Sequence, residues 1–252
     1  MAIKYPCQMF IGSGTFINVL TIIGGASLGV FIGGRMPERM RALITDVLGL
    51  ITILGAATAL VPIASARYTD ALPQGWPLLA ILASLLIGGV IGSAANLESK
   101  LENFGKFLRI KFKADGQGTF VEGFLSSSLL FVIGPLAILG SISDGMGTGT
   151  DQLILKSSLD FFAAMAFAAS LGWGVAASAI PVGIYQGLWT VIGFGLGNIL
   201  SGYQIDAMTI VGGLMLLSIG LGLLKIKTIA VGNLLPALIV APLLVGALHQ
   251  FI

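Results

Sequence analysis

The sequence predicts an all-α membrane protein, a polytopic bundle of about eight transmembrane helices that forms one domain over residues 1–252. Hydrophobic residues make up 56% of the chain and charged residues only 10%, whereas a soluble domain has about 25% charged residues. The apolar residues run in long charge-free stretches, with a mean hydropathy of +1.00. A soluble fold of this size could not bury that much apolar surface, and a membrane β-barrel would alternate with a period of two residues.

Charge-free windows mark the spans, because a spanning helix needs about 20 mostly apolar residues. The windows are 5–34, 47–66, 71–97, 123–143, 161–205, 207–224 and 228–252. The first is too long for a signal-peptide core, so we interpret it as a retained helix. The fifth is about twice the length of a span and contains Gly172, Trp173, Gly174 and Pro181, which predicts two spans or a span and a re-entrant segment.

The eight predicted helices follow these windows in chain order. The first three are separated by charged loops, and the fourth lies between Glu122 and Asp144. The fifth and sixth divide the longest window near Gly172, and the last two flank Lys225 and Lys227. The predicted ranges are 13–34, 42–63, 76–96, 121–142, 153–172, 176–199, 206–224 and 229–250.

Basic residues predict the orientation, because lysine and arginine collect in short cytoplasmic loops. Odd-numbered loops hold ten of them, namely Arg35, Arg39, Arg41, Lys100, Lys106, Arg109, Lys111, Lys113, Lys225 and Lys227. The opposite side has only Lys4, Arg67 and Lys156. Both termini are therefore expected outside the cytoplasm. The basic cytoplasmic loop, at about 97–119, fits either an interfacial helix on anionic headgroups or a solvated extension of the third helix.

A weak internal repeat appears when the chain is shifted by 168 residues. Residues 18–40 then match the later segment at six of their 23 positions, whereas chance would give a match at roughly one position in ten. Because the matched first and sixth helices run in opposite directions, the match predicts an inverted repeat of helices 1–3 and 6–8, typical of secondary transporters. Similar composition is the alternative explanation. The glycines expected at close helix contacts, within one chain or in a homodimer, are Gly25, Gly29, Gly33, Gly193 and Gly197.

Five polar residues within the spans are candidates for a substrate or ion pathway. Asp160 lies well inside the fifth helix, where a carboxylate costs about 2.5–3.5 kcal/mol on insertion scales and needs a partner or a water-filled cavity. The alternative is that the helix starts later and Asp160 lies among the headgroups. Gln186 and Tyr185 lie in the sixth helix, Asn18 matches Gln186 in the repeat, and Asn233 precedes Pro236 in the eighth helix. Hydrogen bonding between helices is the alternative role for these side chains.

The residues needed for most enzymes are absent from the sequence. His249 is the only histidine and Cys7 the only cysteine, which excludes a two-histidine zinc helix, a cysteine zinc site and an internal disulfide. Phosphate-binding and dinucleotide-binding glycine motifs are also absent, and the basic residues form no stripe typical of nucleic-acid binding. We therefore expect no enzyme, no cofactor and no nucleic-acid partner; a metal ion is neither predicted nor excluded.

Several runs resemble a known family. They are Gly14-Thr-Phe-Ile-Asn18, Arg35-Met-Pro-Glu-Arg39, Glu122-Gly-Phe, Gly140-Ser-Ile-Ser-Asp-Gly145, Lys156-Ser-Ser-Leu-Asp160, Ala179-Ile-Pro-Val-Gly-Ile-Tyr-Gln-Gly187 and Val231-Gly-Asn-Leu-Leu-Pro-Ala237. Together they resemble the bacterial integral-membrane family catalogued as domain of unknown function 554. The resemblance implies a multi-pass protein of the bacterial cytoplasmic membrane with a suggested transport role, and it transfers no catalytic residue.

Two functions fit these observations. One is a transporter or channel that moves a small solute or ion through a cavity between inverted repeats. The other is a scaffold or regulatory protein that acts through its basic cytoplasmic loop. A cavity that touches Asp160 and Gln186 would favour transport, whereas a closed core with all polar side chains paired would favour the scaffold.

Overall fold

The computed structural model describes residues 10–35, 37–111, 119–133, 135–147, 149–196 and 200–251. Within these ranges seven helices are long and apolar enough to cross a membrane, and one bent helix pair can supply an eighth span. The prediction of a helical membrane bundle with about eight spans is thus confirmed. The expectations for Lys4, Lys113 and Gly197 lie outside the described residues.

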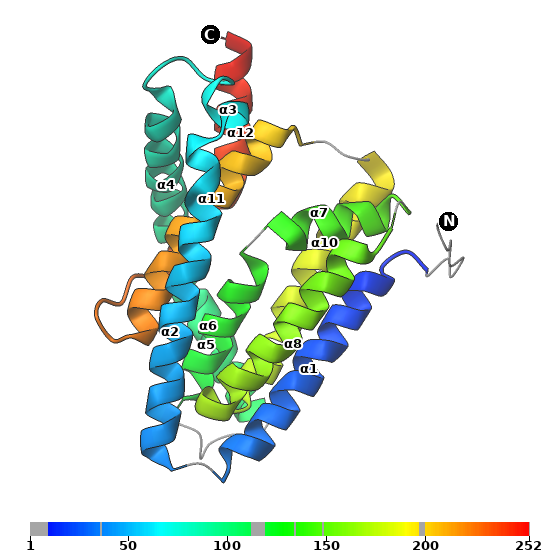
Figure 1. The fold of residues 1–252 in the computed structure, drawn as a ribbon, viewed down its shortest axis with the longest axis vertical. Coiled ribbons are helices and arrows are strands. Elements are labelled where there is room, and N and C mark those ends of the chain that lie inside the picture. Colours follow the sequence, from blue (N-terminus) through cyan, green and yellow to red (C-terminus); the bar gives the residue numbers. More distant parts are fainter. Residues whose placement is uncertain are drawn as a thin grey trace.

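The spans form two groups that are joined along the middle of the molecule (Figure 1). One group contains α1 (Ser13–Gly33), α7 (Pro135–Gly145), α8 (Asp151–Leu171) and α10 (Ala179–Leu196). The other contains α2 (Glu38–Leu60), α4 (Trp76–Ala94), α11 (Gly202–Leu223) and α12 (Ala237–Phe251). The groups are connected by contacts between α2 and α8 and between α11 and α6 (Phe120–Val132). Shorter segments complete the fold: η1 (Val61–Ala64), α3 (Ala66–Thr69), α5 (Leu97–Lys111), α9 (Gly174–Ala177) and η2 (Val231–Leu234).

Helices α1 and α8 make the most extensive contact in the bundle, and glycines on α1 allow it. A Cβ atom at Gly25 would lie 2.2 Å from the Phe161 carbonyl oxygen. At Gly29 and Gly33 it would lie 2.1 Å from the carbonyl oxygens of Met165 and Ala169. Any side chain at these positions would therefore force the two backbones apart. On α10, Gly193 also lies close to α7, since its Cβ would be 2.4 Å from the Ile142 carbonyl oxygen.

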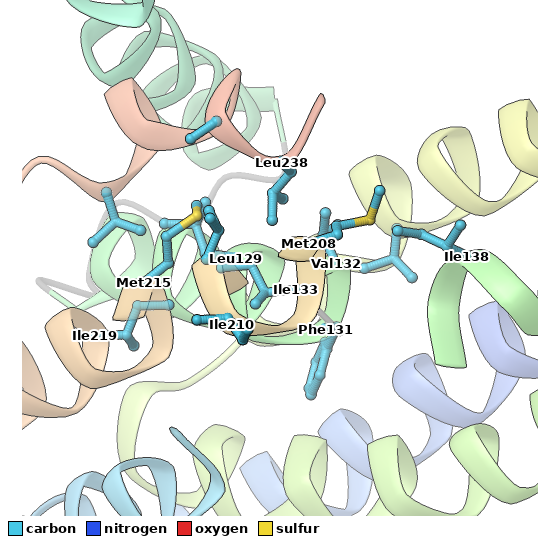
Figure 2. Packing of buried hydrophobic residues seen from close by; sticks show 14 of the residues in the cluster. Leu129, Phe131, Val132, Ile133, Ile138, Met208, Ile210, Met215, Ile219 and Leu238 are labelled. Carbon is cyan, nitrogen blue, oxygen red and sulfur yellow. The ribbon is translucent and has the colours of Figure 1, made fainter. Parts of the chain in front are cut away.

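The fourth span is broken, whereas the sequence predicted one continuous helix over 121–142. Helix α6 ends at Val132, α7 begins at Pro135, and the two are bent by 62°. Proline has no N–H to continue the hydrogen bonds of α6, so a new helix starts there. Figure 2 shows the end of α6 packed between the two groups, with Leu129 and Ile133 beside Met215 and Ile210 of α11.

The longest apolar window contains two spans, as predicted. Helix α8 ends at Leu171, and Gly172 follows with a φ of 77°, a left-handed conformation that glycine adopts without a steric cost. The short α9 then leads into α10, which begins at Ala179. Pro181 lies in the first turn of α10, where the backbone N–H groups have no partner within the helix, so the proline does not break the span.

The basic segment after α4 forms a separate helix, α5, and is not an extension of the third span. Asn96, with a φ of 52°, separates α4 from α5. Gly105 and Leu108 of α5 are buried, and Gly105 lies directly against Phe124 of α6. Phe107 and Ile110 on another face are exposed, 55% and 64% respectively. Apolar side chains exposed beside lysines are typical of a helix at a membrane surface.

Two hydrogen bonds connect the start of α5 to η2. The Gly232 N–H donates to Oε2 of Glu98 at 2.6 Å, and the Glu98 N–H donates to Oδ1 of Asn233 at 3.0 Å. Burial raises the pKa of the Glu98 carboxyl; the hydrogen bond from Gly232 opposes this rise and the Glu102 carboxylate adds to it. These contacts hold two of the basic segments at the same end of the bundle. Which side of the membrane this end faces is a prediction from the positive-inside rule.

Candidate functional site

A buried ion pair lies at the contact between α1 and α8. Nζ of Lys156 is 2.6 Å from Oδ2 of Asp160, and both side chains are less than a tenth exposed. Nδ2 of Asn18, on α1, donates a second hydrogen bond to the same oxygen at 3.0 Å. Lys156 and Asp160 are four residues apart and therefore share one face of α8. The carboxylate thus has a cationic and a neutral donor, and the ion pair as a whole carries no net charge.

Lys156 was counted among the basic residues of the extracytoplasmic side, but its role as the partner of Asp160 was not predicted. Helix α8 already begins at Asp151, which places Lys156 a full turn inside the span. Its ammonium group also lies 5.9 Å from the centre of the Phe131 ring, at the end of α6. A buried ammonium needs a carboxylate or aromatic face in place of water, and Asp160 and Phe131 supply both.

Gln186 is a buried polar side chain of α10. It is 0% exposed, and neither its Oε1 nor its Nε2 makes a hydrogen bond within the described residues. Its neighbours on α10 face α1: the Thr190 hydroxyl lies 3.3 Å from that of Thr15, and a Cβ at Gly183 would lie 3.0 Å from Val19. Gln186 therefore lies on the α1 side of α10, at the level of Thr15 to Val19.

Asp144, at the end of α7, is a second buried carboxylate whose role the sequence did not reveal. Its two oxygens accept hydrogen bonds from the N–H groups of Gly12 and Gly14, at 3.2 and 3.0 Å. The carboxylate thus caps α1, where the helix dipole favours a negative charge. The sequence placed Asp144 in a loop, because a cap supplied by a residue 130 or more positions away leaves no local signal.

A pocket of about 480 Å³ lies between the N-terminal end of α1 and the C-terminal half of α10. Its lining includes Ile11, Thr15, Gly187, Thr190 and Phe194. Asn18 and Gln186 lie about one helical turn from Thr15 and Thr190 along α1 and α10, on the side away from this pocket. Asp160 and Gln186 are not among the described residues that line the pocket, so the buried polar groups are closed off from it in this conformation.

Two of the predicted pathway residues do not join this cluster. Tyr185 is only partly buried, and its ring packs edge-on against Trp189 with centroids 6.3 Å apart. Asn233 caps α5 at the other end of the bundle, as described above. We therefore define the polar cluster as Asn18, Lys156, Asp160 and Gln186. In the described part of the chain, no group of three or more His, Cys, Asp or Glu side chains is arranged to hold a metal ion.

Comparison with known proteins identifies the family. The chain is 30% identical to the uncharacterized membrane protein YdfK of Bacillus subtilis (strain 168) over 239 residues, which cover 94% of this chain and 97% of the relative. It is 31% identical to the uncharacterized protein YqgA of Escherichia coli (strain K12) over 235 residues, 90% of this chain and 94% of the relative. No solved structure matches the chain. The family described as "Protein of unknown function (DUF554)" matches residues 13–246, and the chain therefore belongs to this family.

Proposed function

We propose that the protein is a membrane transporter or channel for a small solute or ion, and that the polar cluster lines its pathway. The observation that carries this proposal is a lysine–aspartate pair buried within the bundle and bonded to Asn18 of α1, the helix that Gln186 also faces from α10. Ionised side chains within a membrane are costly, and they commonly mark ion or substrate pathways. A protein that needed only a stable bundle could replace all four residues with apolar ones.

Two further features of the bundle support transport. The break between α6 and α7 follows Phe131, which contacts Lys156, and discontinuous spans commonly form transporter binding sites. Helices α1, α2 and α4 also contact α10, α11 and α12, the helices that the 168-residue shift pairs with them. This arrangement is compatible with the predicted inverted repeat.

Opening the pathway requires α1 and α10 to separate at the pocket between them, where Thr15 faces Thr190. The polar contact found there is the hydrogen bond between the hydroxyls of Thr15 and Thr190. A neutral hydrogen bond contributes only about 0.5–1.5 kcal/mol net, so it is a weak barrier to separation. Once the helices part, the pocket beside Thr190 becomes continuous with Gln186 and Asn18.

Flux through proteoliposomes tests the proposal. The probes are amino acids, small carboxylates, primary amines, Na⁺ and K⁺, and the test variant is the double substitution Lys156→Met/Asp160→Leu, which removes the charges but keeps apolar volume. We expect at least one probe class to move about tenfold faster than through empty liposomes and to fall to background in the double variant, a loss of about 1.4 kcal/mol or more. Asp70→Asn, at an exposed site, is the matched control and should leave flux unchanged.

Two results would count against the proposal: if no probe class moves through the folded wild-type protein, transport is refuted, and if the double variant moves a probe equally well, the polar cluster does not line the pathway. The first result would favour the alternative, a regulatory protein that acts through its basic segment. The exposed Phe107 and Ile110 beside the lysines of α5 suit contact with anionic headgroups in that case.

A further inference from the structure

We infer that the polar cluster binds a small zwitterionic α-amino acid, with the carboxylate of the ligand on Lys156 and its ammonium group on Asp160. This inference rests on the proposed function and adds the chemical class of the substrate. Three observations lead to it: the charge balance of the cluster, the unused hydrogen-bonding groups around it, and the free space beside Gln186.

Charge balance favours a ligand that has no net charge. The cluster contains one cation and one anion, held 2.6 Å apart, and the nearby Asp144 is already bonded to the N–H groups at the start of α1. A ligand with one charge would leave an uncompensated charge inside the membrane, which is strongly unfavourable. A zwitterion can place its carboxylate on Lys156 and its ammonium group on Asp160, so that one ion pair becomes two and the net charge stays at zero.

Gln186 has the chemistry that such a ligand requires. Its Nε2 can donate to a carboxylate and its Oε1 can accept from an ammonium group, and both atoms are buried without a hydrogen-bond partner in the part of the chain that the structure describes. An unsatisfied buried polar group costs about 1–3 kcal/mol, so a glutamine kept at this depth needs a compensating role. The Ser157 hydroxyl, next to Lys156 in the chain, is also buried and has no hydrogen-bond partner among the described residues.

The available space favours a small side chain. At Gly187, beside Gln186, an added Cβ would meet no atom within 4 Å, and Gly187 also lines the pocket between α1 and α10. At Gly183, one turn away, an added Cβ would lie only 3.0 Å from Val19. Free space therefore lies on the pocket side of Gln186, whereas Val19 occupies the space next to Gly183. Glycine, alanine and serine are the amino acids that this space suits best.

Thermal unfolding of the purified protein with glycine, L-alanine, ethylamine and acetate tests the inference, because a ligand that binds the folded state raises the unfolding midpoint. We expect both amino acids to raise the midpoint and neither single-charge probe to do so. The informative variant is Gln186→Leu, which should fold at least as stably as the wild type, since it removes two unsatisfied polar atoms. It should bind L-alanine about tenfold or more weakly, the equivalent of about 1.4 kcal/mol.

The inference is overturned if ethylamine or acetate stabilises the protein as much as the amino acids do, or if Gln186→Leu binds L-alanine with unchanged affinity. It also fails, while the proposed transport function stands, if another probe class shows flux that depends on Lys156 and Asp160. Amino-acid binding without any flux would instead uphold the site and refute transport.

Discussion

Replacing Asp160 with leucine is expected to destabilise the protein by about 3–5 kcal/mol, the cost typical of removing one partner from a buried ion pair. The Lys156 ammonium would lose its only carboxylate among the described residues, and Asn18 would lose its acceptor. The measurement is the free energy of unfolding in detergent or bicelles, with Asp70→Leu as the control at an exposed site.

The double variant Lys156→Met/Asp160→Leu should recover most of this loss. Replacing a buried ion pair by apolar residues of similar volume is often neutral or stabilising, because the desolvation cost of both charges disappears. The stability of the double variant should therefore lie within about 1 kcal/mol of the wild type or above it, while flux and ligand binding are lost. If the double variant is as unstable as Asp160→Leu, the pair has a structural role that this account does not give it.

Introducing valine at Gly25 is expected to destabilise the protein by about 3 kcal/mol or more, at the upper end of the usual cost of overpacking. The new side chain would meet the Phe161 backbone, which cannot move aside as a flexible side chain could. The resulting shift of α1 away from α8 would also break the hydrogen bond between Asn18 and Asp160.

Gly24→Val is the matched control, since it lies in the same helix and changes helix propensity by the same amount. An added Cβ at Gly24 meets only the edge of the Phe161 ring, at 3.9 Å. Unfolding midpoints and the yield of monodisperse protein should separate the two variants. Equal stability of Gly25→Val and Gly24→Val would contradict the close α1–α8 contact.

The spans could be predicted from the sequence because charge-free length is a local property. The ion pair was partly predictable: Asp160 was identified, and its i,i+4 spacing from Lys156 is a signal that both lie on one helix face. The predicted helix 153–172 already contained both residues, and its start lies two residues from that of α8, but Lys156 was counted only among the basic residues of one side of the membrane and was not considered as the partner of Asp160.

Other features depend on tertiary contacts and left no such signal. The bend at Pro135 lies within a continuous apolar window, and hydropathy does not distinguish a broken span from an intact one. Asn233 has the local sequence of an ion-binding break, yet its side chain caps α5, because η2 packs against that helix. Gln186 could be identified as a buried polar residue, but only the structure shows that its side chain makes no hydrogen bond to any described residue.

Cysteine accessibility at position 186 tests most directly the central claim that an aqueous pathway reaches the polar cluster. In a Cys7→Ser background, Gln186→Cys in proteoliposomes should react with a membrane-impermeant thiol reagent, and L-alanine should slow the reaction. Ile184 is 68% exposed on the outside of the bundle, where we expect it to face lipid, so Ile184→Cys should not react. Failure of Gln186→Cys to react from either side of the membrane would contradict the claim.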